Sequence, residues 1–298
     1  MWNLGKAYLE IGWDSSRERP SVFTILGIVI GSALLFLASL IVCSLLFRGF
    51  IPEQIKGGLY TKGSGLYRVL PIFLSVALGF LPVLMHLRRK LNCSFADAFL
   101  GKNRLNLPWF LGTVAVTWAT YALVEMSFDP GFRWAFPSAD QVILIPFLLV
   151  AILFQSMAEE LFFRGYFSKA LYFFGRSIVP VFVVSPVLFA LYHQQFNPVM
   201  LLYYGGVGVF YSYVSLRTGG LQISTALHFS NNSFAVLAGS LVNPASLSNP
   251  QLLQVGLVRA VQIVVTALLL EAALRFWGMR ERVSDNSIPP AMCDLRSR

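Results

Sequence analysis

Long apolar runs dominate this sequence and limit what it can fold into. Stretches of about 18 or more apolar residues recur along nearly the whole chain, and a helix needs about 20 such residues to cross a lipid bilayer. Only 12% of the residues are charged, whereas about 25% are charged in a typical soluble domain. We therefore expect an all-α polytopic membrane protein.

About eight transmembrane helices are predicted from these runs. Their approximate ranges are 21–47, 69–87, 108–126, 141–163, 178–193, 198–216, 221–242 and 252–277. They form one transmembrane domain, 21–277, which follows an N-terminal segment, 1–20, and precedes a polar tail, 278–298. The sequence WNLGKAYLEIGW at 2–13 fits either an amphipathic helix on the membrane surface or a frayed terminus.

The net charge of +9 is distributed as in a membrane protein rather than in a protein that binds nucleic acid. Most of the 23 Lys and Arg residues lie in polar segments that the predicted spans place on one side of the membrane. Segments rich in Lys and Arg stay on the cytoplasmic side. We expect a multi-pass protein of the cell membrane with both termini cytoplasmic, with the lipid bilayer around it and no nucleic-acid partner.

Three charged residues stand in the sequence AEELFFRGYF at 158–167, at the end of the fourth predicted span. A charged side chain within a span costs roughly 2.5–3.5 kcal/mol even on the most lenient scale. Glu160 and Arg164 are four residues apart and can pair on one helix face. Glu159 lies about 100° further round the helix, and we expect it to have no partner on its own helix. An unpaired carboxylate there predicts a polar site built with other spans.

The other charged residues of the spans have structural explanations. Glu271 and Arg275 are four residues apart and can pair. Arg259 lies near the outer end of the last span, where its side chain can reach the membrane surface. Glu125 and His86 lie at predicted span boundaries.

Two histidines and an amide on neighbouring spans are candidate partners for Glu159. His193 ends the fifth span, while His228 and Asn232 are four residues apart on the seventh and project from one helix face. A turn at Gly175 would form a hairpin that brings Glu159 and His193 within roughly 3 Å of each other along the helix axis. This arrangement requires the fourth helix to continue well beyond its predicted end.

These residue types suit the hydrolysis of an amide bond. A carboxylate and an imidazole can activate a water molecule, and a second imidazole with an amide can stabilise the oxyanion that forms. The sequence contains neither a G-x-S-x-G nor an H-E-x-x-H motif. Two alternatives stay open: Glu159, His193 and His228 can hold a zinc ion, or they can relay protons or bind a cation in a transporter.

Three motifs in this order resemble the signature of the CPBP family, the CAAX proteases and bacteriocin-processing intramembrane proteases, also called Abi. The motifs are E-E-x-x-x-R, F-x-x-x-H and H-x-x-x-N, formed by Glu159, Glu160, Arg164, Phe189, His193, His228 and Asn232. The resemblance covers about residues 142–242. It implies a bundle of about eight helices with a conical intramembrane cavity open toward the cytoplasm, and an endopeptidase that cuts a membrane-associated peptide or protein.

The resemblance also implies a role for each motif residue. Glu159 and His193 would activate the water, and His228 and Asn232 would bind the oxyanion. Glu160, Arg164 and Phe189 would support them. We expect no metal to be required; the alternative is zinc or another divalent metal held by Glu159, His193 and His228. A non-catalytic immunity or scaffold protein of the same fold is a further alternative.

Overall fold

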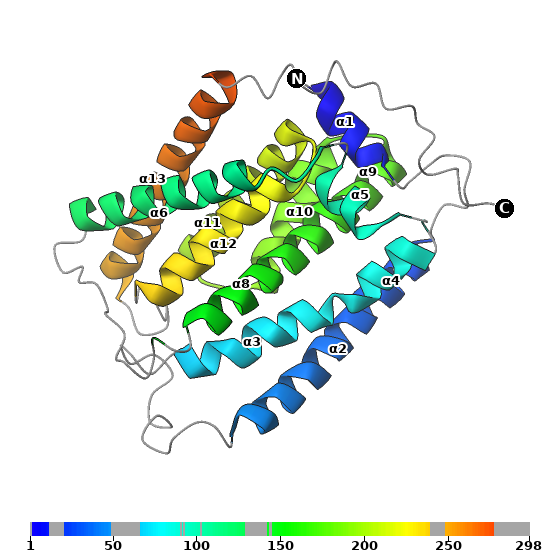
Figure 1. The fold of residues 1–298 in the computed structure, drawn as a ribbon, viewed down its shortest axis with the longest axis horizontal. Coiled ribbons are helices and arrows are strands. Elements are labelled where there is room, and N and C mark those ends of the chain that lie inside the picture. The colour runs from blue at the N-terminus through cyan, green and yellow to red at the C-terminus, as the bar shows by residue number, and fades with distance from the viewer. Residues whose placement is uncertain are drawn as a thin grey trace.

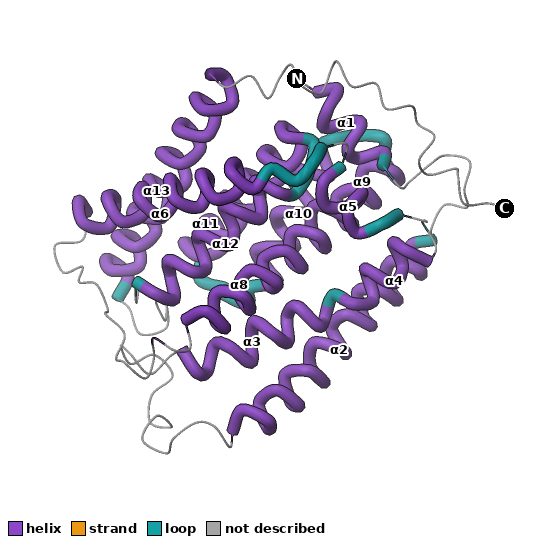
Figure 2. Tube along the Cα trace, viewed as in Figure 1, coloured by secondary structure: helices purple, strands orange, loops and turns teal. Residues whose placement is uncertain are grey.

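The regular structure of the chain is helical, as its apolar runs predict. The computed structural model describes residues 2–11, 21–48, 66–89, 91, 93–101, 103–128, 142, 145–238 and 248–276. Within these ranges every regular element is a helix (Figures 1 and 2). The predicted polar tail, 278–298, and part of the predicted N-terminal segment, 12–20, lie outside the described residues.

The helices differ widely in length. In chain order they are α1 (Trp2–Glu10), α2 (Val22–Arg48), α3 (Leu66–Gly79), α4 (Leu81–Arg89), α5 (Phe95–Leu100), α6 (Leu107–Phe128), α8 (Ile145–Glu160), the π-helical η2 (Leu161–Phe167), α9 (Ser168–Gly175), α10 (Val179–Tyr192), α11 (Pro198–Thr218), α12 (Gln222–Leu237) and α13 (Asn249–Phe276). Among the described residues, six stretches are long and apolar enough to cross a bilayer. They are Val22–Cys43, Pro71–Arg89, Leu107–Phe128, Ile145–Gly175, Pro198–Thr218 and Asn249–Phe276.

The predicted count of about eight spans is not confirmed. The predicted spans at 178–193 and 221–242 correspond to α10 and α12, which have only 14 and 16 residues. A helix of that length falls short of the roughly 20 residues that a bilayer core requires. The six longer stretches nevertheless establish a multi-pass membrane protein. The cytoplasmic placement of both termini stays a prediction.

The fourth predicted span continues well beyond its predicted end. α8, η2 and α9 follow one another without a break and form one apolar stretch, Ile145–Gly175. The stretch ends where Arg176 takes a left-handed conformation with φ 48°. α10 then runs back and packs on α9 and η2. The helical hairpin predicted at Gly175 is therefore present.

α8 and α12 lie at the centre of the bundle (Figure 1). α12 packs on α6, α8 and α11, whereas α8 packs on α3 and α12. α2 lies at the edge of the bundle, where it contacts mainly α3, and α13 packs on α6 and α11. Because most residues of α12 are buried, a polar side chain on it faces other helices rather than lipid.

The N-terminal helix α1 packs on the bundle through α11 and α9. Its Tyr8 and Leu9 are buried, and the Tyr8 hydroxyl donates a hydrogen bond to the Ala98 carbonyl at 2.9 Å. Burial raises the pKa of the Tyr8 phenol, so the hydroxyl stays protonated and able to donate. The Lys169 ammonium lies over the same ring, 4.1 Å from its centroid. These contacts hold α1 against the helical stretch that contains Glu159.

Arg259 does not reach the membrane surface, and the prediction that it snorkels is wrong. Its guanidinium forms an ion pair with Glu125 at 3.1 Å, and both side chains are buried between α13 and α6. Gln262 completes the cluster, because its amide contacts both members of the pair. Glu125 on the neighbouring helix thus compensates the charge of Arg259 within the bundle, so the side chain does not have to extend toward the membrane surface.

The predicted pair of Glu271 and Arg275 is present at 3.2 Å. Glu271 also accepts hydrogen bonds from Tyr213 and Arg217 of α11. His86 bonds the Tyr166 hydroxyl through Nδ1 at 2.8 Å. The pairing predicted for Glu271 is therefore confirmed, and His86 lies near the end of the apolar stretch Pro71–Arg89.

Candidate active site

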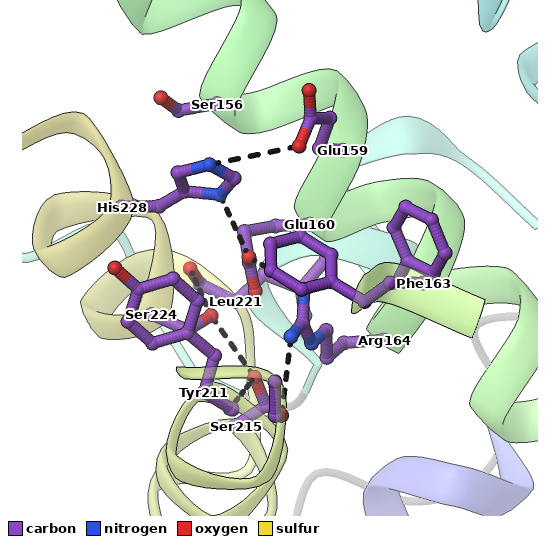
Figure 3. A network of polar contacts seen from close by, with 12 residues as sticks. Ser156, Glu159, Glu160, Phe163, Arg164, Tyr211, Ser215, Leu221, Ser224 and His228 are labelled. Atoms are coloured by element: carbon purple, nitrogen blue, oxygen red, sulfur yellow. Dashed lines mark hydrogen bonds and ion pairs between the residues drawn. The ribbon is translucent and has the colours of Figure 1, made fainter. Parts of the chain in front are cut away.

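Glu160 and Arg164 form the predicted ion pair in the interior of the bundle. Arg164 donates from one terminal nitrogen to Glu160 Oε1 at 3.0 Å and from the other to the Gly208 carbonyl at 3.1 Å. Its guanidinium also lies over the Phe189 ring, 4.4 Å from the centroid. The side chains of the pair are only 0–1% exposed, so each charge depends on the other for compensation. Figure 3 shows the pair within its polar network.

The π-helical segment η2 begins directly after Glu160 and contains Arg164. The Phe163 carbonyl accepts the backbone N–H of Ser168 and also two hydroxyls, that of Ser168 at 2.7 Å and that of Ser185 at 3.1 Å. π-helical turns occur frequently at functional sites because they re-aim side chains. At Gly165 a Cβ would lie 3.0 Å from a Leu221 methyl, so this position needs a residue without a bulky side chain.

His228 of α12 lies between the two glutamates. Its Nδ1 is 3.0 Å from Glu160 Oε1, and its Nε2 is 3.6 Å from Glu159 Oε2 (Figure 3). A carboxylate paired with Arg164 accepts hydrogen bonds, so Nδ1 of His228 carries the hydrogen. Glu160 therefore fixes the orientation of the imidazole ring. The Nε2 atom faces Glu159 at a distance slightly longer than a hydrogen bond.

Glu159 has a partner on its own helix, and the prediction that it has none is wrong. Gln155, four residues earlier on the same face, donates from Nε2 to Glu159 Oε1 at 2.5 Å. The other carboxylate oxygen, Oε2, is buried and makes no hydrogen bond. One oxygen of Glu159 is therefore held, and the other is available to a water molecule or a substrate group.

Asn232 joins this cluster through Gln155 rather than directly. Its Nδ2 donates to Gln155 Oε1 at 2.8 Å, and its Oδ1 accepts from Asn231 at 3.2 Å. Only one of the two Nδ2 hydrogens of Asn232 is used in this bond. Gln155 is thus a site residue that the motif analysis missed, although its i, i+4 spacing to Glu159 was a visible signal.

His193 caps the end of α10 and lies beside the cluster, without a hydrogen bond to Glu159. Its Nδ1 donates to the Phe189 carbonyl at 2.8 Å, and its ring stacks on Tyr204 with centroids 4.0 Å apart. The Phe189 ring lies against both imidazoles, 4.6 Å from that of His193 and 5.9 Å from that of His228. No hydrogen bond or ion pair joins His193 to Glu159, although both residues are described.

The arrangement does not fit a metal site made from the predicted ligands. Within the described part of the chain, no three His, Cys, Asp or Glu side chains are grouped so that they could hold a metal ion. Of the three predicted ligands, Glu159 and His228 approach each other, while His193 bonds the Phe189 carbonyl. Glu160, the other nearby carboxylate, is already bonded to Arg164 and His228.

The fold and these contacts define a multi-pass membrane protein with a buried site of glutamate, histidine and amide side chains. Residues 141–234 match the family model described as type II CAAX prenyl endopeptidase Rce1-like. This range contains all seven motif residues, so the resemblance inferred from the motifs is confirmed there. The match supports a CAAX-protease-like membrane protein of the peptidase class.

One curated relative is the uncharacterized protein YyaK of Bacillus subtilis (strain 168), which is 30% identical over 138 residues. That similarity covers 43% of this chain and 44% of the relative. The chain thus matches less than half of the relative's length. No solved structure matches the chain.

Proposed function

We propose that this protein is an intramembrane endopeptidase that hydrolyses a peptide bond of a membrane-associated peptide or protein. The observation that carries the proposal is the state of Glu159, a buried carboxylate with one oxygen held by Gln155 and the other without a hydrogen bond. A buried carboxylate oxygen without a hydrogen bond is costly. A bound water molecule would satisfy Oε2 and would place a nucleophile beside His228.

In this proposal Glu159 is the general base. Its Oε2 accepts a proton from the water as the water oxygen attacks the carbonyl carbon of the substrate. His193 supports the same water: its Nδ1 hydrogen is donated to the Phe189 carbonyl, so the neutral ring presents Nε2 as an acceptor. Because no hydrogen bond joins Glu159 to His193, the water would lie between them.

In this proposal His228 and Asn232 stabilise the oxyanion of the tetrahedral intermediate. In this role His228 carries a hydrogen on Nε2 as well as the one that Nδ1 donates to Glu160. The Nε2 hydrogen and the second Nδ2 hydrogen of Asn232 would both be donated to the oxygen that becomes negative.

The reaction is completed by collapse of the tetrahedral intermediate. The carbon–nitrogen bond breaks, and the proton taken up by Glu159 passes to the departing amine. The acyl carbon keeps the water oxygen as a new carboxyl group, and Glu159 returns to its ionised state. We propose that this sequence requires no metal ion, which is supported by the poor fit of the predicted ligand set.

The test uses purified protein with a panel of membrane-associated peptides, both farnesylated and unmodified, and identifies the products by mass spectrometry. We expect at least one peptide to be cut at a single bond. Asn232→Ala, purified in parallel, should turn over about 100-fold more slowly, because it lacks one oxyanion donor. Equal product from both preparations would trace the cleavage to a contaminant, and no product across the panel would contradict the proposal.

A further inference from the structure

A line of hydrogen bonds runs from α11 to Glu159 through the side-chain amides of Asn231, Asn232 and Gln155. The Tyr203 hydroxyl donates to Asn231 Oδ1 at 2.9 Å, and Asn231 donates to Asn232 Oδ1 at 3.2 Å. Asn232 donates to Gln155 Oε1 at 2.8 Å, and Gln155 donates to Glu159 Oε1 at 2.5 Å. The line begins on α11, passes along α12 and ends on α8.

The carboxylate at one end sets the direction of every bond in this line. An ionised Glu159 only accepts, so Gln155 must turn its NH₂ group toward Glu159 and its oxygen toward Asn232. Asn232 then presents its own NH₂ group to that oxygen. All three amides therefore point their N–H groups toward Glu159. Hydrogen bonds aligned in this way polarise and strengthen one another.

We infer that Gln155 is a positioning residue that holds the general base and the oxyanion donor in a fixed relation; this inference rests on the proposed function. Gln155 is the only residue of the line that bonds both Glu159 and Asn232. By occupying Glu159 Oε1 it leaves Oε2 for the water (Figure 3 shows the two oxygens pointing apart). By occupying one Nδ2 hydrogen of Asn232 it leaves the other for the oxyanion.

Because Gln155 is buried, its hydrogen bonds to Glu159 and Asn232 cannot be replaced by bonds to solvent if they are lost. The side chain is 4% exposed, so solvent does not compete for its amide. No hydrogen bond joins Glu159 directly to Asn232, and both residues are described. Without the amide at 155 each of them would lose a partner and could rotate independently of the other.

The first test measures turnover by Gln155→Met, which keeps the length of the side chain and removes the hydrogen bonds to Glu159 and Asn232, together with a longer one from Ser156. We expect kcat to fall about 10- to 100-fold, the effect of one hydrogen bond to a charged group, while KM stays within about threefold. Gln262→Met is the matched control, because Gln262 is an equally buried glutamine that bonds Arg259 and Glu125 instead. It should lower the melting temperature and leave kcat unchanged.

An unchanged kcat in Gln155→Met, or a loss confined to KM, would overturn the inference. A fall in kcat of the same size in Gln262→Met would also overturn it, because the effect would then reflect a loosened fold.

The second test does not depend on activity. The melting-temperature shifts of Glu159→Leu, which removes the acceptor of the Gln155 amide, and of Asn232→Leu should be non-additive by about 2 °C or more while Gln155 is present, and additive once Gln155→Met is introduced. Additive shifts in both backgrounds would overturn the inference. If the wild type cleaves no peptide, the proposed function fails, and the melting shifts alone decide whether Gln155 couples the two residues.

Discussion

Replacing Glu160 separates its effect on stability from its effect on chemistry. Glu160→Gln removes the charge that compensates Arg164, whose side chain is 1% exposed. The guanidinium would keep only neutral partners, which are the new amide oxygen, the Gly208 carbonyl and the faces of aromatic rings, among them that of Phe189. Leaving one member of a buried ion pair uncompensated costs about 3–5 kcal/mol. We expect Glu160→Gln to lower the unfolding free energy in detergent by that amount.

Replacing both members of the pair should restore the stability but not the activity. In the double variant Glu160→Met, Arg164→Met no charge is left unpaired, and apolar side chains of similar volume are nearly neutral in such positions. The imidazole of His228 would still lose the carboxylate that holds its Nδ1 hydrogen. We therefore expect kcat to stay about 10- to 100-fold below wild type, the effect of one charge-assisted hydrogen bond.

The assay is unfolding of the purified variants in mixed detergent, followed by turnover of a cleaved peptide. Arg275→Gln is the control, because Arg275 is 73% exposed and its pairing with Glu271 should contribute less than about 1 kcal/mol. If Glu160→Gln alone is as stable as wild type, Glu160 does not compensate the buried charge of Arg164 and the reasoning is refuted. A double variant with wild-type kcat would refute the role of Glu160 in orienting His228.

Three further predictions concern residues around the site and its cofactor requirement. Glu125→Gln removes the charge of the carboxylate that pairs with Arg259, so it should destabilise the protein by at least about 1 kcal/mol and leave kcat unchanged, as measured by unfolding and turnover together. Gly101 has φ +64°, and a Cβ there would collide with the Gly219 carbonyl, so Gly101→Ala should cost at least about 1–3 kcal/mol in the same unfolding assay. Incubation with EDTA should leave peptide turnover unchanged; a loss that zinc reverses would contradict the proposed metal-free mechanism.

Contacts within one helix could be predicted from the sequence. The pair of Glu160 and Arg164, and that of Glu271 and Arg275, follow from i, i+4 spacing alone. The hairpin after Gly175 also follows from the sequence, because a long apolar stretch must end at a turn. Local geometry therefore located the cluster and several of its members.

Contacts between helices could not be predicted in the same way. The pairing of Arg259 with Glu125 and that of His228 with Glu160 depend on how α13 meets α6 and how α12 meets α8. The rotation of a helix about its own axis determines such contacts, and the nearly uniform apolar sequence of these spans does not specify it. The π-helical segment after Glu160 changes that rotation further.

Gln155 was missed for a different reason. Its spacing to Glu159 was the same i, i+4 signal that revealed the pair of Glu160 and Arg164. An uncharged amide in an apolar run is a weaker sequence signal than a charged residue, although its polar groups also need hydrogen bonds inside the membrane. Buried amides within four residues of an intramembrane carboxylate are therefore worth testing as part of its site.

Turnover by Glu159→Gln is the most direct measurement of the central claim. The variant keeps the size of the side chain and an oxygen for Gln155, but its amide cannot take a proton from water. We expect it to keep the wild-type melting temperature within about 2 °C and to lose peptide cleavage below detection. Cleavage by this variant at the wild-type rate would show that Glu159 is not the base and would contradict the proposed mechanism.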